Sequence, residues 1–412
     1  MSASPTSVIR AVGACLPDRV VTNDDLVAAG LNTSDDWIRT RTGIAARRRV
    51  APGTSTGDLA TRAAESALAS APGDTPRLVI LATTTPDHPC PATAPQIASR
   101  LGLTDVPAFD LAAVCSGFVY ALATADAWIR AGAVTSALVI GAETYSTIVD
   151  PADRDTAPIF GDGAGAVVLG RGDPDEPGAI LATDLGSDGT GADQVMIATG
   201  GSRAPAAPGP HTLRMKGREV YGHAVRRMTT SAQRTLDRLR WPADSVGAFI
   251  GHQANQRILD AVADRLAIAP AHRFGNIRDV GNTAAASIPL VLADVASKGA
   301  VRPGTRTLLT AFGGGLTWGC AALTWPDLTK EPTMTTLDSP VYEHVAHVLT
   351  TKFDVLTVEP DATFDDLGMD SLAVVELFVT LSEHWGIVLD DAEADPELTV
   401  QALVGLVERA RS

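Results

Sequence analysis

The chain has 412 residues, of which 45% are hydrophobic and 20% are charged, and its formal net charge is −15. This length exceeds that of one ordinary domain, and the composition is that of a folded protein. The acidic balance disfavours nucleic-acid binding, which needs a basic face. Because no apolar run is long enough to span a membrane and the first residues resemble no signal, we expect a cytoplasmic protein without a membrane segment.

The negative charge is concentrated at the C-terminal end of the chain. Residues 335–412 hold 16 acidic and 3 basic residues, a net charge of −13, which leaves −2 for the first 334 residues. An acidic tail can be a solubilising segment, but this one has regular apolar spacing. We therefore expect a nearly neutral body followed by a small, acidic, folded domain.

The body reads as alternating strands and helices. Strand composition is found in LVILAT (78–83), VPAFDLA (106–112) and SALVIGAE (136–143). Helical spacing of apolar residues follows at 94–101 and 115–131. This alternation predicts an α/β protein with buried sheets flanked by helices.

A weak internal repeat divides this body. Three pairs of similar segments occur in the same order along the chain, which favours duplication over chance. We expect two halves of one α/β domain, at about 1–170 and 171–325. The paired segments are 78–102 with 246–268, 137–143 with 307–315, and 163–170 with 319–325.

The last part of the chain separates from the body through a linker. Residues 326–337 are rich in Thr and Pro without an apolar period, which is typical of a linker. Residues 338–412 have the apolar spacing of a small helical bundle. Its helices are expected from Pro340, over 371–384 and over 400–410. The inward-facing residues are expected to be Val341, Val345, Val348 and Leu349 on the first helix, and Leu372, Val375, Phe378 and Val379 on the second.

Four cysteines lie far apart, and no Cys/His cluster suggests a metal site. Cys115 differs from the others because it follows a predicted strand and begins a predicted helix. A helix N-terminus favours the thiolate and lowers the pKa of a thiol, so this position suits a nucleophile. A buried structural cysteine could occupy the same place.

Two polar turns and a glycine loop complete a candidate site. GHQANQ places His252 directly after an apolar strand, and VGNTAAAS places Asn282 in a glycine-flanked turn. FGGGLTWG (312–319) adds a glycine loop, where backbone N–H groups can approach a substrate oxygen closely. A thiolate that attacks a thioester, with an imidazole and an amide that donate to a developing enolate, is the set that thioester chemistry needs.

These residues lie in motifs that resemble β-ketoacyl-acyl-carrier-protein synthase III. The resemblance covers residues 8–325 and implies the duplicated thiolase fold, five layers in the order αβαβα, and a homodimer. It also implies that Cys115, His252 and Asn282 form the catalytic triad, and that the N–H groups of Cys115 and Gly314 form an oxyanion hole. The motifs are TSDDWIRTRTGI (33–44), VCSGFVYAL (114–122), DPADR (150–154), FGDGAGA (160–166), GHQAN (251–255), GNTAAAS (281–287) and AFGGGLTWG (311–319).

The same resemblance implies a coenzyme A site. Trp37 and Arg154 match residues that sandwich the adenine, and an indole and a guanidinium are reasonable stacking partners for a purine. Thr33, Arg41 and Asn255 match nucleotide or pantetheine contacts. The structural alternative is that Trp37 only packs and that Arg154 is an ordinary surface cation.

The segment FDDLGMDSLAVVEL (364–377) resembles the phosphopantetheine attachment motif of acyl carrier proteins. The resemblance implies that Ser371 carries a covalent 4'-phosphopantetheine, which a phosphopantetheinyl transferase would attach. A serine at a helix N-terminus suits a phosphodiester, because the negative charge meets the helix dipole. The structural alternative is that Asp370 or Ser371 only caps the helix.

Together these features predict an acyltransferase without a metal. The leading hypothesis is acylation of Cys115 by an acyl-CoA, followed by decarboxylative Claisen condensation with a malonyl-type thioester on a carrier, in fatty-acid or polyketide-type biosynthesis. Other carrier or synthase enzymes are further candidate partners. The alternatives are acyl transfer through Cys115 without condensation, and a non-catalytic body that only positions its carrier.

Overall fold

The chain divides into two compact units in the computed structural model. A large unit consists of Met1–Val50 and Ser55–Thr336, and a second, mainly helical unit consists of Leu337–Ser412 with the short segment Ala51–Thr54. The structure describes residues 5–71, 75–204, 211–328, 334–337 and 340–411, apart from 354, 356–357, 359–361 and 391–393. Within these residues, no helix combines the length and the apolarity that crossing a membrane would require.

Two central sheets form the large unit. In the first sheet the strands have the order β15-β1-β7-β6-β4-β5, and in the second the order is β12-β11-β13-β14-β8. The first sheet contains β1 (Thr6–Pro17), β4 (Val79–Ala82), β5 (Ala108–Leu111), β6 (Ser136–Thr144), β7 (Asp162–Gly172) and β15 (Met334–Leu337). The second contains β8 (Ile180–Ser187), β11 (Ala248–Gly251), β12 (Arg273–Phe274), β13 (Arg306–Gly313) and β14 (Thr317–Thr324).

The two sheets repeat one topology. In the first, β4 is parallel to β5 and β6, and β7 is antiparallel to β6 and β1. In the second, β11 is parallel to β12 and β13, and β14 is antiparallel to β13 and β8. All three segment pairs of the sequence repeat occupy equivalent strands, β4 with β11, β6 with β13 and β7 with β14. The predicted duplicated α/β fold is therefore confirmed.

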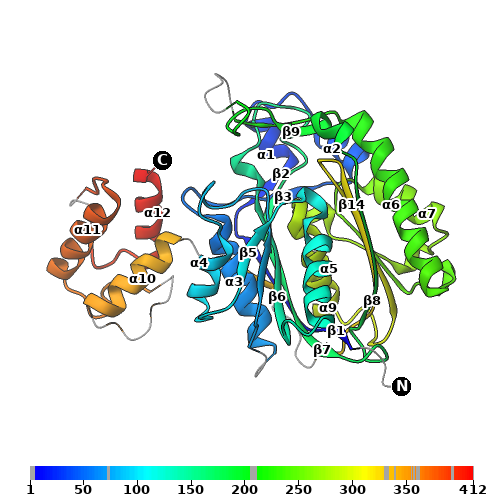
Figure 1. Ribbon diagram of the computed structural model, residues 1–412. Coiled ribbons are helices and arrows are strands. Elements are labelled where there is room, and N and C mark those ends of the chain that lie inside the picture. Colours follow the sequence, from blue (N-terminus) through cyan, green and yellow to red (C-terminus); the bar gives the residue numbers. More distant parts are fainter. Residues whose placement is uncertain are drawn as a thin grey trace. The chain divides into compact units, whose positions relative to one another are not determined.

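Helices complete five layers (Figure 1). Two central helices, α5 (Gly117–Arg130) and α9 (Ser287–Ser297), lie between the sheets. The outer layers contain α3 (Thr56–Ala69) and α4 (Ala94–Arg100) on one side, and α6 (Gly217–Leu239) and α7 (Gln256–Arg265) on the other. The apolar spacing predicted for α5 is correct, because Phe118, Ala121, Leu122, Ala125 and Ile129 are all buried in the core. The remaining short elements are α1 (Asn23–Ala28), α2 (Asp35–Thr42), α8 (Ile277–Val280), β2 (Val20–Thr22), β3 (Ala46–Arg48), β9 (Val195–Ile197) and β10 (Leu213–Met215).

Part of the predicted linker has regular structure. Residues 334–337 form β15, which hydrogen-bonds to β1 at the edge of the first sheet. The linker predicted over 326–337 thus includes a four-residue edge strand, which is too short to leave an apolar period in the sequence. Residues 329–333 lie outside the described part of the chain.

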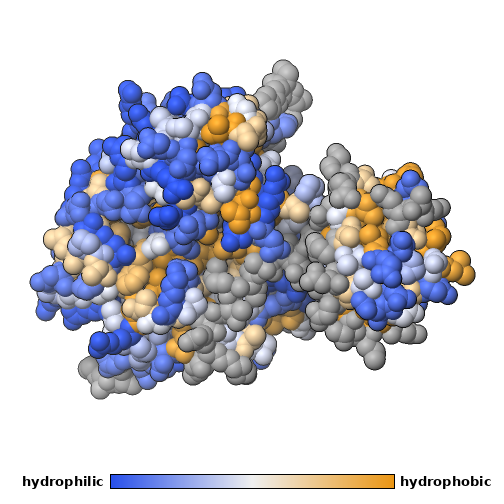
Figure 2. Space-filling view, turned by 180° about the vertical axis from the view of Figure 1, so that it is seen from behind, coloured by the Kyte–Doolittle hydropathy of each residue, from blue (hydrophilic) through white to orange (hydrophobic). Residues whose placement is uncertain are grey.

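The helical unit contains α10 (Pro340–Lys352), α11 (Ser371–Trp385) and α12 (Val400–Arg411). The four inward-facing residues predicted on α10 are buried. On α11 the prediction was wrong for Leu372 and Val379, which are 77% and 47% exposed. The buried residues are Val374, Leu377, Phe378 and Leu381, which follow a helical period one step away from the predicted face. Apolar side chains consequently lie on the surface of this unit (Figure 2).

The core of the helical unit provides a stability test. Replacement of the fully buried Phe378 by Ala should cost about 3–5 kcal/mol, which is comparable to the whole stability of so small a unit. Hydrogen exchange of the full chain should therefore show loss of protection in α10–α12, while the sheets of the large unit stay protected. The matched control is Leu372→Ala, which should change stability by less than about 0.5 kcal/mol because Leu372 is exposed. Equal loss of protection in both units would contradict this independence.

Candidate active site

Cys115 lies in a short 3-10 turn, Val114–Ser116, between β5 and α5. Val114 has a φ of 49°, a left-handed conformation that costs energy for a β-branched residue. Hydroxyl groups hold this turn: Ser116 Oγ donates to the carbonyl of Ala113 at 2.8 Å, and Thr317 Oγ1 donates to the same carbonyl at 3.0 Å. The strained turn raises Cys115 above the sheet and leaves its N–H among the unpaired donors at a helix start.

The thiol differs electrostatically from the prediction. Cys115 is half-buried, and enclosure of its sulfur by the cavity wall raises the pKa of the thiol, with a further rise from the negative charge of Glu143. The expectation of a lowered pKa was therefore wrong for the resting protein. Position at a helix start was the only signal in the sequence, and the desolvation that opposes it comes from the fold.

His252 follows β11 and is 1% exposed. Its Nδ1 lies 2.7 Å from Ser287 Oγ, at the start of α9, while its Nε2 is buried without a hydrogen-bond partner among the described residues. Burial lowers the pKa of the imidazole to about 3, so the ring is neutral at physiological pH. A neutral imidazole whose Nε2 has no partner can donate a hydrogen bond to a substrate atom or accept one from it.

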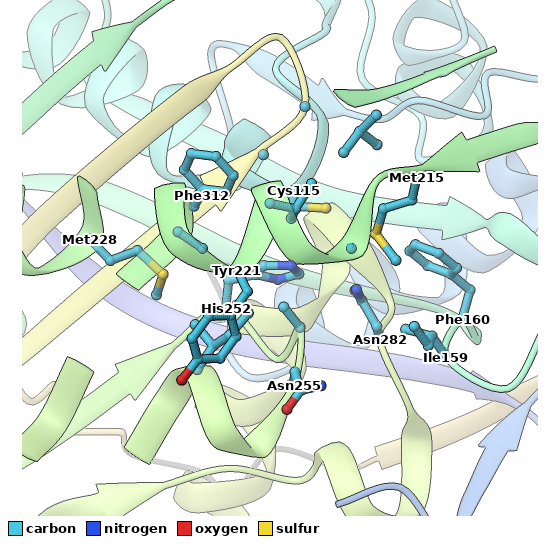
Figure 3. A pocket seen from close by; sticks show the side chains of 18 of the residues that line it. Cys115, Ile159, Phe160, Met215, Tyr221, Met228, His252, Asn255, Asn282 and Phe312 are labelled. Atoms are coloured by element: carbon cyan, nitrogen blue, oxygen red, sulfur yellow. The ribbon is translucent and has the colours of Figure 1, made fainter. Parts of the chain in front are cut away.

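Asn282 is placed by the backbone around it. Its Oδ1 accepts from the N–H of Ala284 at 2.9 Å, and its backbone carbonyl accepts from Gly161 N at 3.0 Å. Because the amide oxygen is engaged in the turn, the Nδ2 group is left to donate into the cavity. Figure 3 shows Cys115, His252 and Asn282 around the same cavity, contributed by different elements.

The glycine loop closes over the cysteine. A Cβ on Gly313 would lie 2.9 Å from the backbone nitrogen of Cys115 and 2.9 Å from the carbonyl oxygen of Ala113. Only glycine therefore permits this approach of the β13–β14 turn to Cys115. Gly314, the predicted oxyanion donor, follows directly and lines the same cavity.

The cavity encloses about 810 Å³, part of which is open to solvent. Its wall is mostly apolar and contains Cys115, His252, Asn282, Asn255 and Gly314 among the predicted residues. Sequence reasoning missed several apolar and aromatic wall residues. Phe160 and Phe312 lie within the motifs FGDGAGA and AFGGGLTWG but were assigned no role. The others lie outside the motifs and are Tyr145, Ile159, Val195, Met215, Val220, Met228 and Ile258.

Glu143 is a second group that sequence reasoning missed. It is fully buried at the end of β6, where Oε2 accepts from Thr84 N at 3.0 Å and from Thr85 Oγ1 at 2.8 Å. Burial raises the pKa of this carboxyl group to about 7. The available signal was a carboxylate inside the otherwise apolar strand SALVIGAE.

The structure brings the predicted adenine residues together. Arg154 Cζ lies 4.4 Å from the centroid of the Trp37 ring, and Arg41 Cζ lies 5.1 Å from it. A planar base between an indole and a guanidinium needs about 7–8 Å, twice an ordinary contact distance. Arg154 is exposed and would have to swing away before a purine could enter.

The other two predicted contacts differ from each other. Asn255 caps α7 by accepting from Arg257 N at 2.9 Å, and its Nδ2 donates to the carbonyl of Arg41 at 2.9 Å. Both the oxygen and the nitrogen of the Asn255 amide are therefore engaged in hydrogen bonds within the protein. Thr33 Oγ1 is buried without a hydrogen-bond partner among the described residues, so it keeps its capacity for a further bond.

Ser371 is the first residue of α11 and is exposed. The preceding Asp370 caps the helix by accepting from Ala373 N at 2.9 Å. The capping alternative therefore applies to Asp370 and leaves the Ser371 hydroxyl for other chemistry. An exposed hydroxyl at the positive end of a helix fits the attachment of a phosphate-linked arm.

Comparison with known proteins agrees with this arrangement. Residues 109–189 match the model of 3-oxoacyl-[acyl-carrier-protein] synthase III, residues 236–325 match the model of its C-terminal part, and residues 340–407 match the phosphopantetheine attachment site. A β-ketoacyl-[acyl-carrier-protein] synthase III of Streptomyces coelicolor is 57% identical over 331 residues, which cover 79% of this chain and 99% of the relative.

Solved structures give the same picture. The 3-oxoacyl-(acyl carrier protein) synthase III of Pseudomonas aeruginosa is 49% identical, with a TM-score of 0.75, over 79% of this chain and 100% of that chain. The priming β-ketosynthase of the R1128 polyketide pathway is 33% identical, with a TM-score of 0.75, over 80% and 98%. The chain therefore belongs to the β-ketoacyl-acyl-carrier-protein synthase III family of acyltransferases, and it carries a C-terminal phosphopantetheine attachment domain.

Proposed function

We propose that the large unit catalyses a decarboxylative Claisen condensation on Cys115. The observation that carries the proposal is the pairing, in one cavity, of a neutral His252 with an open Nε2 and an Asn282 amide whose oxygen is already engaged. Two neutral donors beside a thiol suit an enolate, which needs hydrogen bonds without a proton transfer.

In the first half of the reaction, Cys115 takes an acyl group from an acyl-CoA. The sulfur of Cys115 attacks the thioester carbonyl carbon, and the N–H groups of Cys115 and Gly314 donate to the oxyanion of the tetrahedral intermediate. The C–S bond to coenzyme A then breaks, and the proton of the Cys115 thiol leaves with the coenzyme A thiol. Burial raises the pKa of Cys115, so the attack requires removal of this proton, because the thiolate is the nucleophilic form.

In the second half, a malonyl-type thioester occupies the cavity. Its carboxylate leaves as CO₂, and the electron pair of the broken C–C bond moves into an enolate. The thioester oxygen accepts from His252 Nε2 and Asn282 Nδ2, which stabilises the developing charge in a water-poor site. The enolate carbon attacks the acyl carbon on Cys115, and the cysteine sulfur leaves.

Ser371 is the proposed attachment site of the phosphopantetheine. The arm, when attached, presents an acyl or malonyl group as a thioester. This chain supplies an exposed hydroxyl at the N-terminus of α11, and Asp370 relieves Ser371 of the capping role. A phosphopantetheinyl transferase would have to modify Ser371, and other carriers or synthases remain candidate partners of both units.

A homodimer is part of the proposal. Strand β5 lies at the edge of the first sheet, so one row of its backbone N–H and C=O groups is unpaired within the sheet, and all four of its residues are half-buried. A second copy could continue the sheet across this edge by an isologous contact. A fused carrier, together with similarity to a priming synthase of a polyketide pathway, supports a role in starting a specialised fatty-acid or polyketide chain.

The central test separates the two half-reactions. In Asn282→Ala, intact-protein mass spectrometry should still show acylation of Cys115, whereas CO₂ release from a malonyl thioester should fall about 10²–10³-fold, as expected for loss of one oxyanion donor. Cys115→Ala should abolish acylation, and Cys90→Ala should not, because Cys90 is an exposed cysteine outside the cavity. If the protein without substitutions acylates Cys115 but releases no CO₂, its reaction is simple acyl transfer. If it shows neither acylation of Cys115 nor CO₂ release, the large unit is a non-catalytic body.

The coenzyme A site can be tested through the nucleotide. Trp37→Ala should raise the KM for an acyl-CoA about tenfold, because aromatic stacking on a base is worth about 1–3 kcal/mol, and should leave the KM for the matching acyl-pantetheine unchanged. The control is Trp241→Ala, which removes another indole that lies 5.0 Å from an arginine, Arg306. An equal effect of Trp37→Ala on both substrates would place the adenine elsewhere.

Attachment to Ser371 gives a direct mass measurement. Incubation of the full chain with coenzyme A and a phosphopantetheinyl transferase should add one phosphopantetheine, and Ser371→Ala should prevent it. Ser382→Ala, on the same helix but half-buried, should be modified like the unaltered protein. Modification of Ser371→Ala at another residue would refute the assignment.

A further inference from the structure

The inner side of the His252 ring contacts one hydroxyl group. Ser287 is 1% exposed, and its Oγ lies 2.7 Å from His252 Nδ1. The same oxygen accepts from the backbone N–H of Gln253 at 3.4 Å. The opposite ring nitrogen, Nε2, opens into the cavity that contains Cys115.

Hydrogen-bond accounting decides where the protons of this pair lie. The bond from Gln253 N uses Ser287 Oγ as an acceptor, so the hydroxyl hydrogen still needs an acceptor of its own. Among the described residues, His252 Nδ1 is the one acceptor in contact with that hydroxyl. A buried hydroxyl hydrogen left unpaired would cost about 1–3 kcal/mol. The hydroxyl therefore donates to Nδ1, which must then be unprotonated.

We infer that Ser287 is a positioning residue that fixes His252 in the tautomer with hydrogen on Nε2. A neutral ring with Nδ1 as acceptor has its hydrogen on Nε2, facing the substrate. The inference extends the proposed function, since it explains how His252 is a donor in the condensation. It also means that His252 in this state cannot accept the proton of Cys115, because its open nitrogen already carries one.

The other tautomer would reverse the effect of the ring. With hydrogen on Nδ1, the Nε2 lone pair would face the thioester oxygen and repel the developing negative charge. Only Asn282 would then remain as a donor, and the loss would approach the roughly 10²–10³-fold cost of one oxyanion-hole donor. Acylation of Cys115 uses backbone N–H groups and should depend much less on the tautomer.

The first experiment needs no substitution. The full chain, labelled with ¹⁵N-histidine, should show His252 with a protonated Nε2 and an unprotonated, hydrogen-bonded Nδ1 in long-range ¹H–¹⁵N spectra. The His252 signals are assigned as those that disappear in His252→Gln, among the eight histidines of the chain. A proton on Nδ1 in the unaltered protein would overturn the inference.

The second experiment uses matched serines of one helix. Ser287→Ala should move most of the His252 population to the tautomer with hydrogen on Nδ1, lower condensation about 10- to 100-fold, and change Cys115 acylation by less than about threefold. Ser287→Thr retains the hydroxyl and should restore the single tautomer. Ser297→Ala, at the other end of α9, removes a hydroxyl that donates to the carbonyl of Asp294 and should change nothing.

The outcomes distinguish the inference from the proposed function. A Ser287→Ala protein that keeps one Nε2–H tautomer and full condensation would refute the role of Ser287. An unaltered protein with the Nε2–H tautomer that acylates Cys115 but releases no CO₂ would refute the condensation, while the positioning by Ser287 would stand.

Discussion

The site depends on the packing of two strained turns at the centre of the large unit. The turn Val114–Ser116 precedes α5, and the equivalent turn Ala284–Ala286 precedes α9 in the other half of the duplicated fold. The two turns contact each other, and each begins with a left-handed residue, Val114 at 49° and Ala284 at 45°. The fold thus repeats one backbone device and gives each copy a different chemical task.

Small side chains make this packing possible. A Cβ on Gly141 would lie 2.4 Å from the carbonyl oxygen of Ala285, which is too close for any residue but glycine. The first turn presents Cys115, while the second is pure alanine and leads directly into Ser287. Cys115 of one half therefore lines the same cavity as His252, whose ring contacts Ser287 of the other half. Strained residues of this kind persist where the surrounding structure fixes the backbone, and here the two turns pack against each other.

Enclosure sets the charge states of the site. The same desolvation that raises the pKa of Cys115 lowers the pKa of His252 to about 3 and raises that of Glu143 to about 7. Each group is thereby shifted toward its neutral form. Burial destabilises a resting Cys115 thiolate because it removes the water that would solvate the charge, whereas a neutral donor such as the Asn282 amide can stabilise an anion that forms on a bound substrate. Such a site favours a negative charge that develops on the substrate over a negative charge on the resting cysteine.

In the helical unit, capping of α11 and presentation of an exposed hydroxyl group fall to two different residues. Asp370 satisfies the helix N-terminus, and Ser371 presents its hydroxyl to solvent. Beside Ser371 lies Leu372, which is 77% exposed, and Glu376 forms an ion pair with Lys352 at 3.0 Å. A covalent tether would also raise the local concentration of any thioester on Ser371 for the enzyme that its arm can reach, without any new contact.

The sequence was sufficient for those features that depend on local pattern. Strand composition and helical spacing predicted β4, β6, α5 and α10, and the repeat predicted the paired topology. The spacing failed on α11, where Leu372 and Val375 suggested a buried face and the core selected Val374 and Leu377 instead. Two adjacent apolar stripes on one helix cannot be ranked without the partner helices.

The residues of the candidate site could also be predicted only in part, because some of their contacts form only in the folded chain. Cys115, His252 and Asn282 could be named from their motifs because each follows a strand or a glycine turn. The partner of His252 could not, since Ser287 is 35 residues away and becomes a neighbour only when α9 packs beneath β11. The pKa of the thiol was predicted in the wrong direction for the same reason. A helix start is visible in a sequence, whereas the wall that excludes water from it is assembled from both halves of the fold.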